Sequence, residues 1–158
     1  MNLGITITST VLVLLVVTPV VLIQQQQKKK SRNLLKALKT LANTHNCSIT
    51  KYDVFKNFAI GLDKQNNSLF FYKKSSSKET KQQINLNEVK SCGVFNSKKT
   101  THENVSGDTV KLELILNSVE SSSNNKSIEL YNQTEDFELN GELEIVSKWK
   151  HIIHNAIK

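Results

Sequence analysis

The chain has 158 residues, a net charge of +7 at neutral pH, five glycines and one proline. Residues 1–52 carry seven Lys or Arg and no acidic residue, whereas residues 53–158 carry fourteen basic and fourteen acidic residues. The part after residue 52 therefore lacks the basic surface typical of DNA- and RNA-binding proteins, and no nucleic-acid partner is expected.

An uncharged apolar segment, Leu3 to Ile23, opens the chain. As a helix it would be about 31 Å long, which matches the roughly 30 Å hydrocarbon core of a bilayer. Its β-branched residues favour a strand in water, but in lipid only a helix satisfies every backbone group within one segment. We therefore expect a single membrane-spanning helix in contact with the lipid bilayer. The residues that mark the span are Leu3, Ile5, Leu12, Leu15, Val20 and Ile23.

Two other kinds of segment can be long and apolar, a cleaved signal peptide and a buried core helix. A cleaved signal peptide would need a basic start, a shorter apolar core and small residues before the cleavage site. Here Val21, Leu22 and Ile23 stand before Gln24, and no Lys or Arg precedes the apolar segment. A buried core helix is the other alternative, but such helices seldom run this long without a polar face. The membrane span is the favoured interpretation.

A basic run directly follows the apolar segment, and we interpret it as topogenic. Lys and Arg accumulate on the cytoplasmic side of a span, so the N-terminus should lie outside and the C-terminal domain in the cytoplasm. The topogenic residues are Lys28, Lys29, Lys30 and Arg32.

Residues 28–45 are predicted to form a basic juxtamembrane amphipathic helix. Leu34, Leu38, Leu41 and Ala42 follow the spacing of one helical face. This helix either continues the span or docks on the domain, and a basic amphipathic helix beside a membrane can also lie on anionic lipid. A packed connector is the preferred interpretation.

Residues 46–158 are predicted to form the soluble domain, and their pattern changes from helical to strand-like. Residues 53–62 are interpreted as one strand, 63–67 as a turn and 68–73 as a second strand, which together make a hairpin. Shorter alternating or apolar runs predict four more strands. These lie at 83–86, 88–96, 109–116 and 127–131.

An amphipathic helix is predicted from about Leu139 to Ile157. Its apolar face should bury against the sheet, with Val146, Trp149 and Ile153 in the core. Trp149 should be the most costly of these residues to truncate.

Six or seven short strands followed by one amphipathic helix with a central tryptophan resemble the pleckstrin-homology domain. Trp149, within residues 146–153, carries the resemblance, which covers about residues 53–157. Residues 60–71 also resemble the first hairpin of uncharacterised bacterial membrane-anchored proteins. The resemblance implies an α+β fold, in which a small antiparallel β-barrel or strongly bent sheet is closed by the C-terminal helix. Lipid-binding members carry several basic residues in and after the first hairpin turn. This chain offers Lys64, Lys73, Lys74 and Lys78 without arginine, so no lipid ligand is implied.

No catalytic, metal or cofactor signature was found, and we expect a protein that is not an enzyme and binds no cofactor. His151 and His154 could share a metal on a helix, but lysines surround them and a solvated pair is favoured. Glu135, Asp136 and Glu138 are interpreted as helix-start charges rather than a general acid–base pair. Cys47 and Cys92 are interpreted as plain thiols, at least one of them buried.

Three functional hypotheses follow. The first is a membrane-anchored cytoplasmic binding or scaffolding module (residues 1–27 as anchor), whose ligand is a protein partner or the lipid face beside it. The alternative is a structural or assembly subunit of a membrane complex, packed through Thr6, Ser9, Thr10 and Thr18 of the span. The third is an enzyme whose pocket forms only in the fold.

Overall fold

The computed structural model describes residues 3–76, 78–99, 107–120, 125–136 and 138–157, and side chains from residue 9 onward. These residues form the helices α1 (Leu3–Thr44) and α2 (Glu142–Ala156). The strands are β1 (Lys51–Phe55), β2 (Phe58–Asp63), β3 (Ser68–Lys74), β4 (Glu79–Asn85), β5 (Val89–Lys98), β6 (Thr109–Ser118) and β7 (Lys126–Asn132). A 3-10 helix, η1 (Leu86–Glu88), connects β4 to β5.

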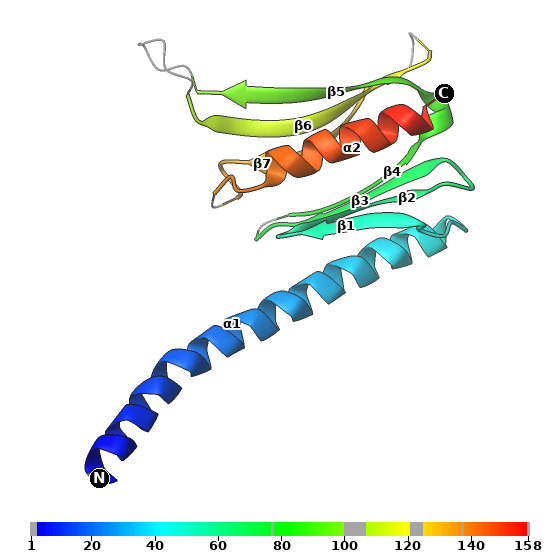
Figure 1. Ribbon diagram of the computed structural model, residues 1–158. Coiled ribbons are helices and arrows are strands. Elements are labelled where there is room, and N and C mark those ends of the chain that lie inside the picture. The colour runs from blue at the N-terminus through cyan, green and yellow to red at the C-terminus, as the bar shows by residue number, and fades with distance from the viewer. Residues whose placement is uncertain (1–2, 77, 100–106, 121–124, 137, 158) are drawn as a thin grey trace.

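The strands form two antiparallel sheets, one of four strands in the order β1-β2-β3-β4 and one of three in the order β5-β6-β7. Figure 1 shows α2 between the two sheets and the second half of α1 along the other side of the four-stranded sheet. The predicted α+β class, with antiparallel strands and a C-terminal helix, is confirmed.

The described strands do not form a closed barrel, because no ladder joins the two sheets. Side chains make the connection instead. Gln82 on β4 donates a hydrogen bond through Nε2 to the carbonyl of Ser127 on β7 at 3.1 Å. The two sheets are therefore linked by a side-chain hydrogen bond and not by backbone hydrogen bonds between β4 and β7.

The predicted hairpin around residues 63–67 is confirmed as β2 and β3. The single strand expected over residues 53–62 is wrong, since the chain reverses there and Phe55 pairs with Phe58. The two turn residues are Lys56 and Asn57, and Lys56 has a φ of 40°. Lysine is not a typical residue at positive φ, so the sequence carried little signal for this turn.

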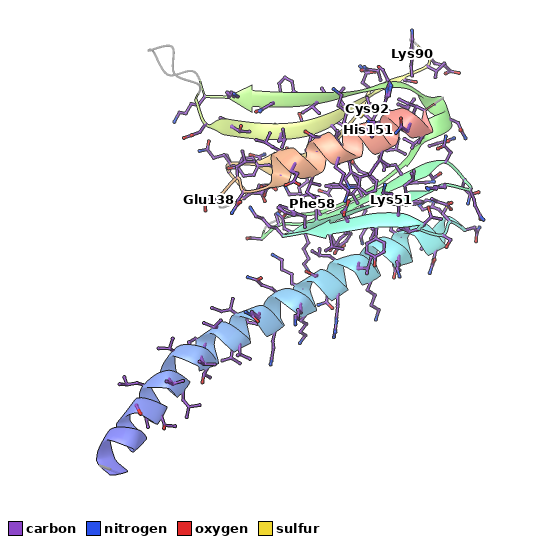
Figure 2. The ribbon with its side chains drawn as sticks, in the orientation of Figure 1. Lys51, Phe58, Lys90, Cys92, Glu138 and His151 are labelled. Atoms are coloured by element: carbon purple, nitrogen blue, oxygen red, sulfur yellow. The ribbon has the colours of Figure 1, made fainter. Side chains whose placement is uncertain are left out.

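The inner face of the four-stranded sheet, the three-stranded sheet and α2 share one apolar core. Val146, Trp149 and Ile153 of α2 are buried there. Phe58 of β2 belongs to the same cluster and is labelled in Figure 2. The Trp149 indole donates a 2.8 Å hydrogen bond to Asp53 on β1, so its polar group is satisfied. The helix begins at Glu142, later than the expected 139, after Gly141 at a φ of 89°.

The outer face of the four-stranded sheet packs on α1. Leu34, Leu38 and Ala42 of α1 are buried against Ala59 and Phe70 in a second apolar cluster. The helix approaches the sheet closely at Gly61. A Cβ atom there would lie 3.1 Å from Leu38 Cδ2 and 2.9 Å from Ile49 Cγ2. Glycine in this strand therefore permits the close approach.

The first half of α1 extends away from the domain, as Figure 1 shows. Ser9–Thr44 contains a window long and apolar enough to cross a membrane, and none of that window is buried. The helix is continuous from this apolar segment, through Pro19 and the basic run, to the part that docks on the sheet. Residues 28–45 thus both continue the apolar helix and pack on the domain.

Candidate functional site

Three connections of the β-domain line one cavity together with α1, and we call them the basal end. They are the turn between β1 and β2, the loop after β3 and the segment that precedes α2. With Gln27, Lys30 and Ser31 of α1 they surround a cavity of about 670 Å³. Segments far apart in the sequence therefore meet beside the helix that carries the apolar segment.

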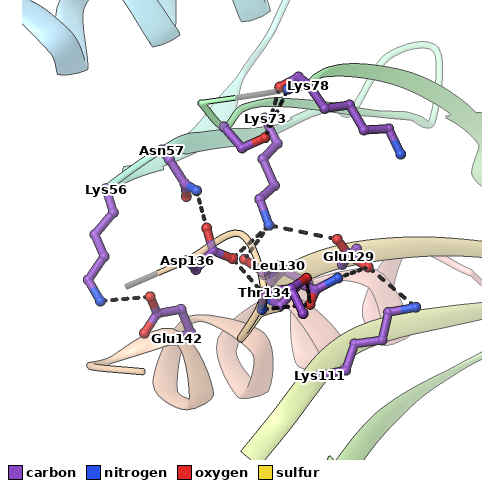
Figure 3. A network of polar contacts seen from close by, with 12 residues as sticks. Lys56, Asn57, Lys73, Lys78, Lys111, Glu129, Leu130, Thr134, Asp136 and Glu142 are labelled. Atoms are coloured by element: carbon purple, nitrogen blue, oxygen red, sulfur yellow. Dashed lines mark hydrogen bonds and ion pairs between the residues drawn. The ribbon is translucent and has the colours of Figure 1, made fainter. Parts of the chain in front are cut away.

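Lys73, close to the end of β3, is the centre of a polar network at the basal end (Figure 3). Its side chain is only 4% exposed, and Nζ lies 2.8 Å from Asp136 Oδ2 and 3.9 Å from Glu129 Oε1. It also donates a hydrogen bond to the carbonyl of Leu130 on β7 at 3.5 Å. Lys73 thus joins the four-stranded sheet to the second sheet and to the segment before α2.

Asp136 is the acceptor at the middle of this network. It accepts hydrogen bonds from Lys73, from the backbone N–H of Asn132 at 2.8 Å and from the side-chain amide of Asn57. These partners hold the segment before α2 against the β1–β2 turn. The interpretation of Asp136 as a helix-start charge is wrong, because α2 begins only at Glu142.

A second ion pair closes the basal end. Lys56 Nζ lies 2.8 Å from Glu142 Oε1 and donates to the carbonyl of Glu138 at 2.8 Å. The other carboxylate oxygen of Glu142 accepts a hydrogen bond from the backbone N–H of Asn140 at 2.6 Å. The half-buried Asp136 and the buried Glu142 are therefore each paired with a lysine, Lys73 of β3 and Lys56 of the β1–β2 turn.

A second cavity, the basic cleft, lies between α1 and the end of β3 and has a volume of about 530 Å³. Three lysines line it, Lys29 and Lys30 from α1 and Lys74 from β3, and no acidic residue of the described ranges does. The other lining residues are neutral: Gln26, Asn33, Leu34, Tyr72, Ser75 and Ser76. This combination suits an anion.

A more apolar cavity continues the basic cleft along α1, away from the apolar segment. It has a volume of about 540 Å³ and shares Asn33 and Tyr72 with the basic cleft. Ala37 and Leu41 form its apolar wall, and its charged lining residues include both Glu79 and Lys81. Charges of both signs make it less selective for an anion than the basic cleft.

The outer edge of β5 is a third feature, remote from the basal end. β5 has β6 as its single neighbouring strand among those described. The adjacent residues Val94 and Phe95 are 38% and 45% exposed. Their register partners, Leu114 and Glu113, place them on opposite faces of the sheet. An exposed apolar pair thus lies on both sides of an open strand edge.

Most residues singled out in the sequence lie apart from these features. Leu12, Leu15, Val20 and Ile23 are exposed on α1, while Leu3 and Ile5 belong to its first turns. Lys28, Lys29, Lys30 and Arg32 are exposed on the same helix, and of these Lys29 and Lys30 are exceptions, since they line the basic cleft. His151 and His154 are exposed on α2, and the described residues hold no group of three that could bind a metal.

Both cysteines are buried and lie on different elements. Burial raises the pKa of the Cys92 thiol to about 11, although the nearby Lys150 opposes this. Burial, and then the charge of Asp63, also raise the pKa of Cys47. A raised pKa keeps a thiol protonated and a poor nucleophile. The interpretation of both residues as plain thiols agrees with this geometry.

The Lys73–Asp136 pair and the basic cleft were not found from the sequence. Lys73 lies in a strand, where alternation with apolar neighbours would suggest a solvated side chain. The sequence offered one signal for this pair, the cluster of acidic residues at 135–138. No lysine lies near this cluster in the sequence, so its cation had to come from elsewhere in the chain.

No family model, curated protein or solved structure matches this chain. The function proposed below is therefore based on the geometry of the chain's own residues.

Proposed function

We propose that this protein is a single-pass membrane protein whose cytoplasmic β-domain is a pleckstrin-homology-like binding module without catalytic activity. The apolar half of α1 is the anchor, and the domain binds a protein partner at the membrane surface. The fold proposal is supported by the strand order, four strands and then three, and by the buried tryptophan of α2 between the sheets.

The proposal of a protein partner is based on the open edge of β5. An edge strand presents unpaired backbone N–H and C=O groups, and an extended segment of another chain can pair with them. Irregular register at Val89–Ser91 and Ser97–Lys98 interrupts both ends of β5 and leaves its centre regular. Val94 and Phe95 lie in that centre. The occupant we propose is an extended segment of a partner protein, added as a strand beside β5.

The ion pairs of the basal end support a role other than catalysis. Lys73, Asp136, Lys56 and Glu142 are paired with one another and hold connections together. A general base needs a lone pair within reach of a substrate proton. These carboxylates are instead occupied by structural partners.

The test is co-purification of the full-length protein from mild detergent. Phe95→Asp should remove the partner, because a charge would be buried beside the added strand. Leu143→Asp is the matched control, since Leu143 is 46% exposed on α2, and it should retain the partner. Partner retention in Phe95→Asp would contradict the proposed surface.

Replacing residues 3–23 with an unrelated apolar helix separates the binding module from the alternative of a structural subunit. A module that binds through β5 should keep its partner after this exchange. Loss of the partner on exchange, with no effect of Phe95→Asp, would instead assign the contact to the membrane span.

Orientation can be tested with a membrane-impermeant thiol reagent in intact cells. Cys47 and Cys92 are buried and therefore unsuitable as probes. Lys64→Cys, in the exposed turn between β2 and β3, is the better probe. It should react only after the membrane is opened, and labelling in intact cells would reverse the proposed orientation.

A further inference from the structure

We propose that the basic cleft binds the phosphate-bearing head group of an anionic phospholipid in the membrane that holds α1. The inference rests on the proposed membrane anchoring, but it adds a ligand and a site that are separate from the edge of β5. The site is formed by α1 and the end of β3, on the outer side of the four-stranded sheet.

The height of the cleft above the apolar segment fits a head group. Lys29 and Lys30 follow Ile23, the last apolar residue of the segment, by six and seven positions. At 1.5 Å per residue they lie about 9–10 Å beyond it along the helix axis. The polar layer on each side of a bilayer is about 5–8 Å thick, and tilting of the helix shortens the vertical distance. The lysines therefore lie at the outer boundary of the head groups.

The packing of α1 on the sheet brings a third lysine to the same cleft. Leu34 and Leu38 are buried on the sheet, so β3 is held alongside the basic part of α1. Lys74, the last residue of β3, therefore lines the cleft opposite Lys29 and Lys30. Without this docking, the lysines of the helix and the strand would have no fixed spacing.

The surrounding charges favour an anion in the cleft rather than in the neighbouring cavity of the basal end. That cavity shares Lys30 and Lys74 with the cleft but also contains four acidic residues. Asp136 and Glu142 are paired with Lys73 and Lys56, while Glu135 and Glu138 also line that cavity. In the part of the chain that the structure describes, no carboxylate lines the cleft itself.

The chemistry of the lining residues defines the class of lipid. Lysine ammonium groups recognise phosphate as point charges, without the planar geometry that arginine imposes. Ser75 is occupied, because its hydroxyl bonds to the backbone of Lys78. We therefore infer recognition of the shared phosphodiester of anionic phospholipids, with little preference for the remainder of the head group.

The test uses the full-length protein in nanodiscs of phosphatidylcholine with phosphatidylglycerol. Native mass spectrometry counts the phosphatidylglycerol molecules that stay bound to the protein when it is released from the nanodisc. Lys74→Gln should lower its retention about fivefold, the effect expected for one lysine near an anionic surface. Lys78→Gln makes the same charge change on the same hairpin but does not line the cleft, and it should match the unaltered protein.

Equal retention in Lys74→Gln and Lys78→Gln would overturn the site and leave only general attraction to the basic run. Inorganic phosphate, added at the concentration of lipid phosphate, should not displace the bound lipid. Displacement of the lipid by phosphate would show that the cleft binds a soluble phosphate and not a lipid head group. Flotation of the protein with vesicles is measured first. Failure to float would overturn the membrane anchoring as well as the lipid site. Flotation together with equal lipid retention in Lys74→Gln and Lys78→Gln would overturn the lipid site alone.

Discussion

The two faces of the four-stranded sheet are covered by opposite ends of the chain. The inner face packs on α2 and the three-stranded sheet, and the outer face packs on the second half of α1. As a result β2 is buried at every position and β3 at all but its last. The helix that follows the apolar segment is therefore part of the fold and not a flexible tether.

The two faces are held by different kinds of contact. On the inner side, directional bonds accompany the apolar core, such as Trp149 to Asp53 and Lys73 to Asp136. On the outer side the contact with α1 is mainly apolar and depends on the close approach at Gly61. The inner face should therefore be the less tolerant of substitution, and the following predictions test this difference.

Trp149→Ala should have the largest effect, a loss of about 3–5 kcal/mol in the free energy of unfolding. It creates a cavity in the inner core and removes the donor to Asp53. Chemical denaturation of the full-length protein in detergent measures it, with Trp149→Phe as the control that keeps most of the volume. A loss below about 1 kcal/mol would show that the core does not depend on this residue.

Lys73→Met should cost about 3 kcal/mol in the free energy of unfolding, because it leaves the Asp136 side chain, which is only 10% exposed, without its cation. Lys111→Met is the matched control. The Lys111 side chain is 37% exposed, so its ion pairs with Glu113 and Glu129 should contribute less than about 1 kcal/mol. Equal effects in the same denaturation experiment would contradict the structural role of Lys73.

Leu38→Ala tests the outer face and should cost about 2–3 kcal/mol, at the low end for a buried leucine because the surrounding cluster is small. Leu15→Ala is the control on the same helix. Leu15 is 67% exposed, whereas Leu38 is 0% exposed, so Leu15→Ala should leave unfolding of the domain unchanged. If both variants unfold like the unaltered protein, α1 does not contribute to the stability of the domain.

Asp63 should make the outer side sensitive to acid. Burial alone would raise its pKa, but hydrogen bonds from Asn66, Ser48 and Gln65 outweigh burial and lower it from 3.8 to about 2. Because the pKa is lower in the folded state, the stabilisation is complete above the ordinary value and is lost as the pH falls toward 2.

The expected loss is about 2 kcal/mol between roughly pH 5 and pH 2. Ser48 lies just after α1, so the connection between α1 and the sheet should loosen first. Hydrogen exchange at Ser48 as a function of pH measures this loosening. Asp63→Asn should remove the pH dependence of exchange at Ser48 in this range. An unchanged pH dependence would exclude Asp63 as its cause.

Elements with a clear period could be predicted from the sequence. The apolar segment, the helical spacing of Leu34, Leu38 and Ala42, and the apolar face around Trp149 each correspond to a helix in the structure. The turn at Lys56 and Asn57 could not be predicted, because it lacks the glycine or proline that usually marks a reversal.

The sequence by itself determined that the chain begins with a helix able to cross a membrane, that its positive charge adjoins that helix, and that an α+β domain follows. Only the tertiary structure decided that α1 packs on the outer face of the sheet, that Lys73 pairs with Asp136, and that Lys74 faces Lys29 and Lys30 across a cleft. The physical reason is that periodicity shows which side of an element avoids water, but not which element covers it. Partners such as Lys73 and Asp136, 63 residues apart, are chosen by packing in three dimensions.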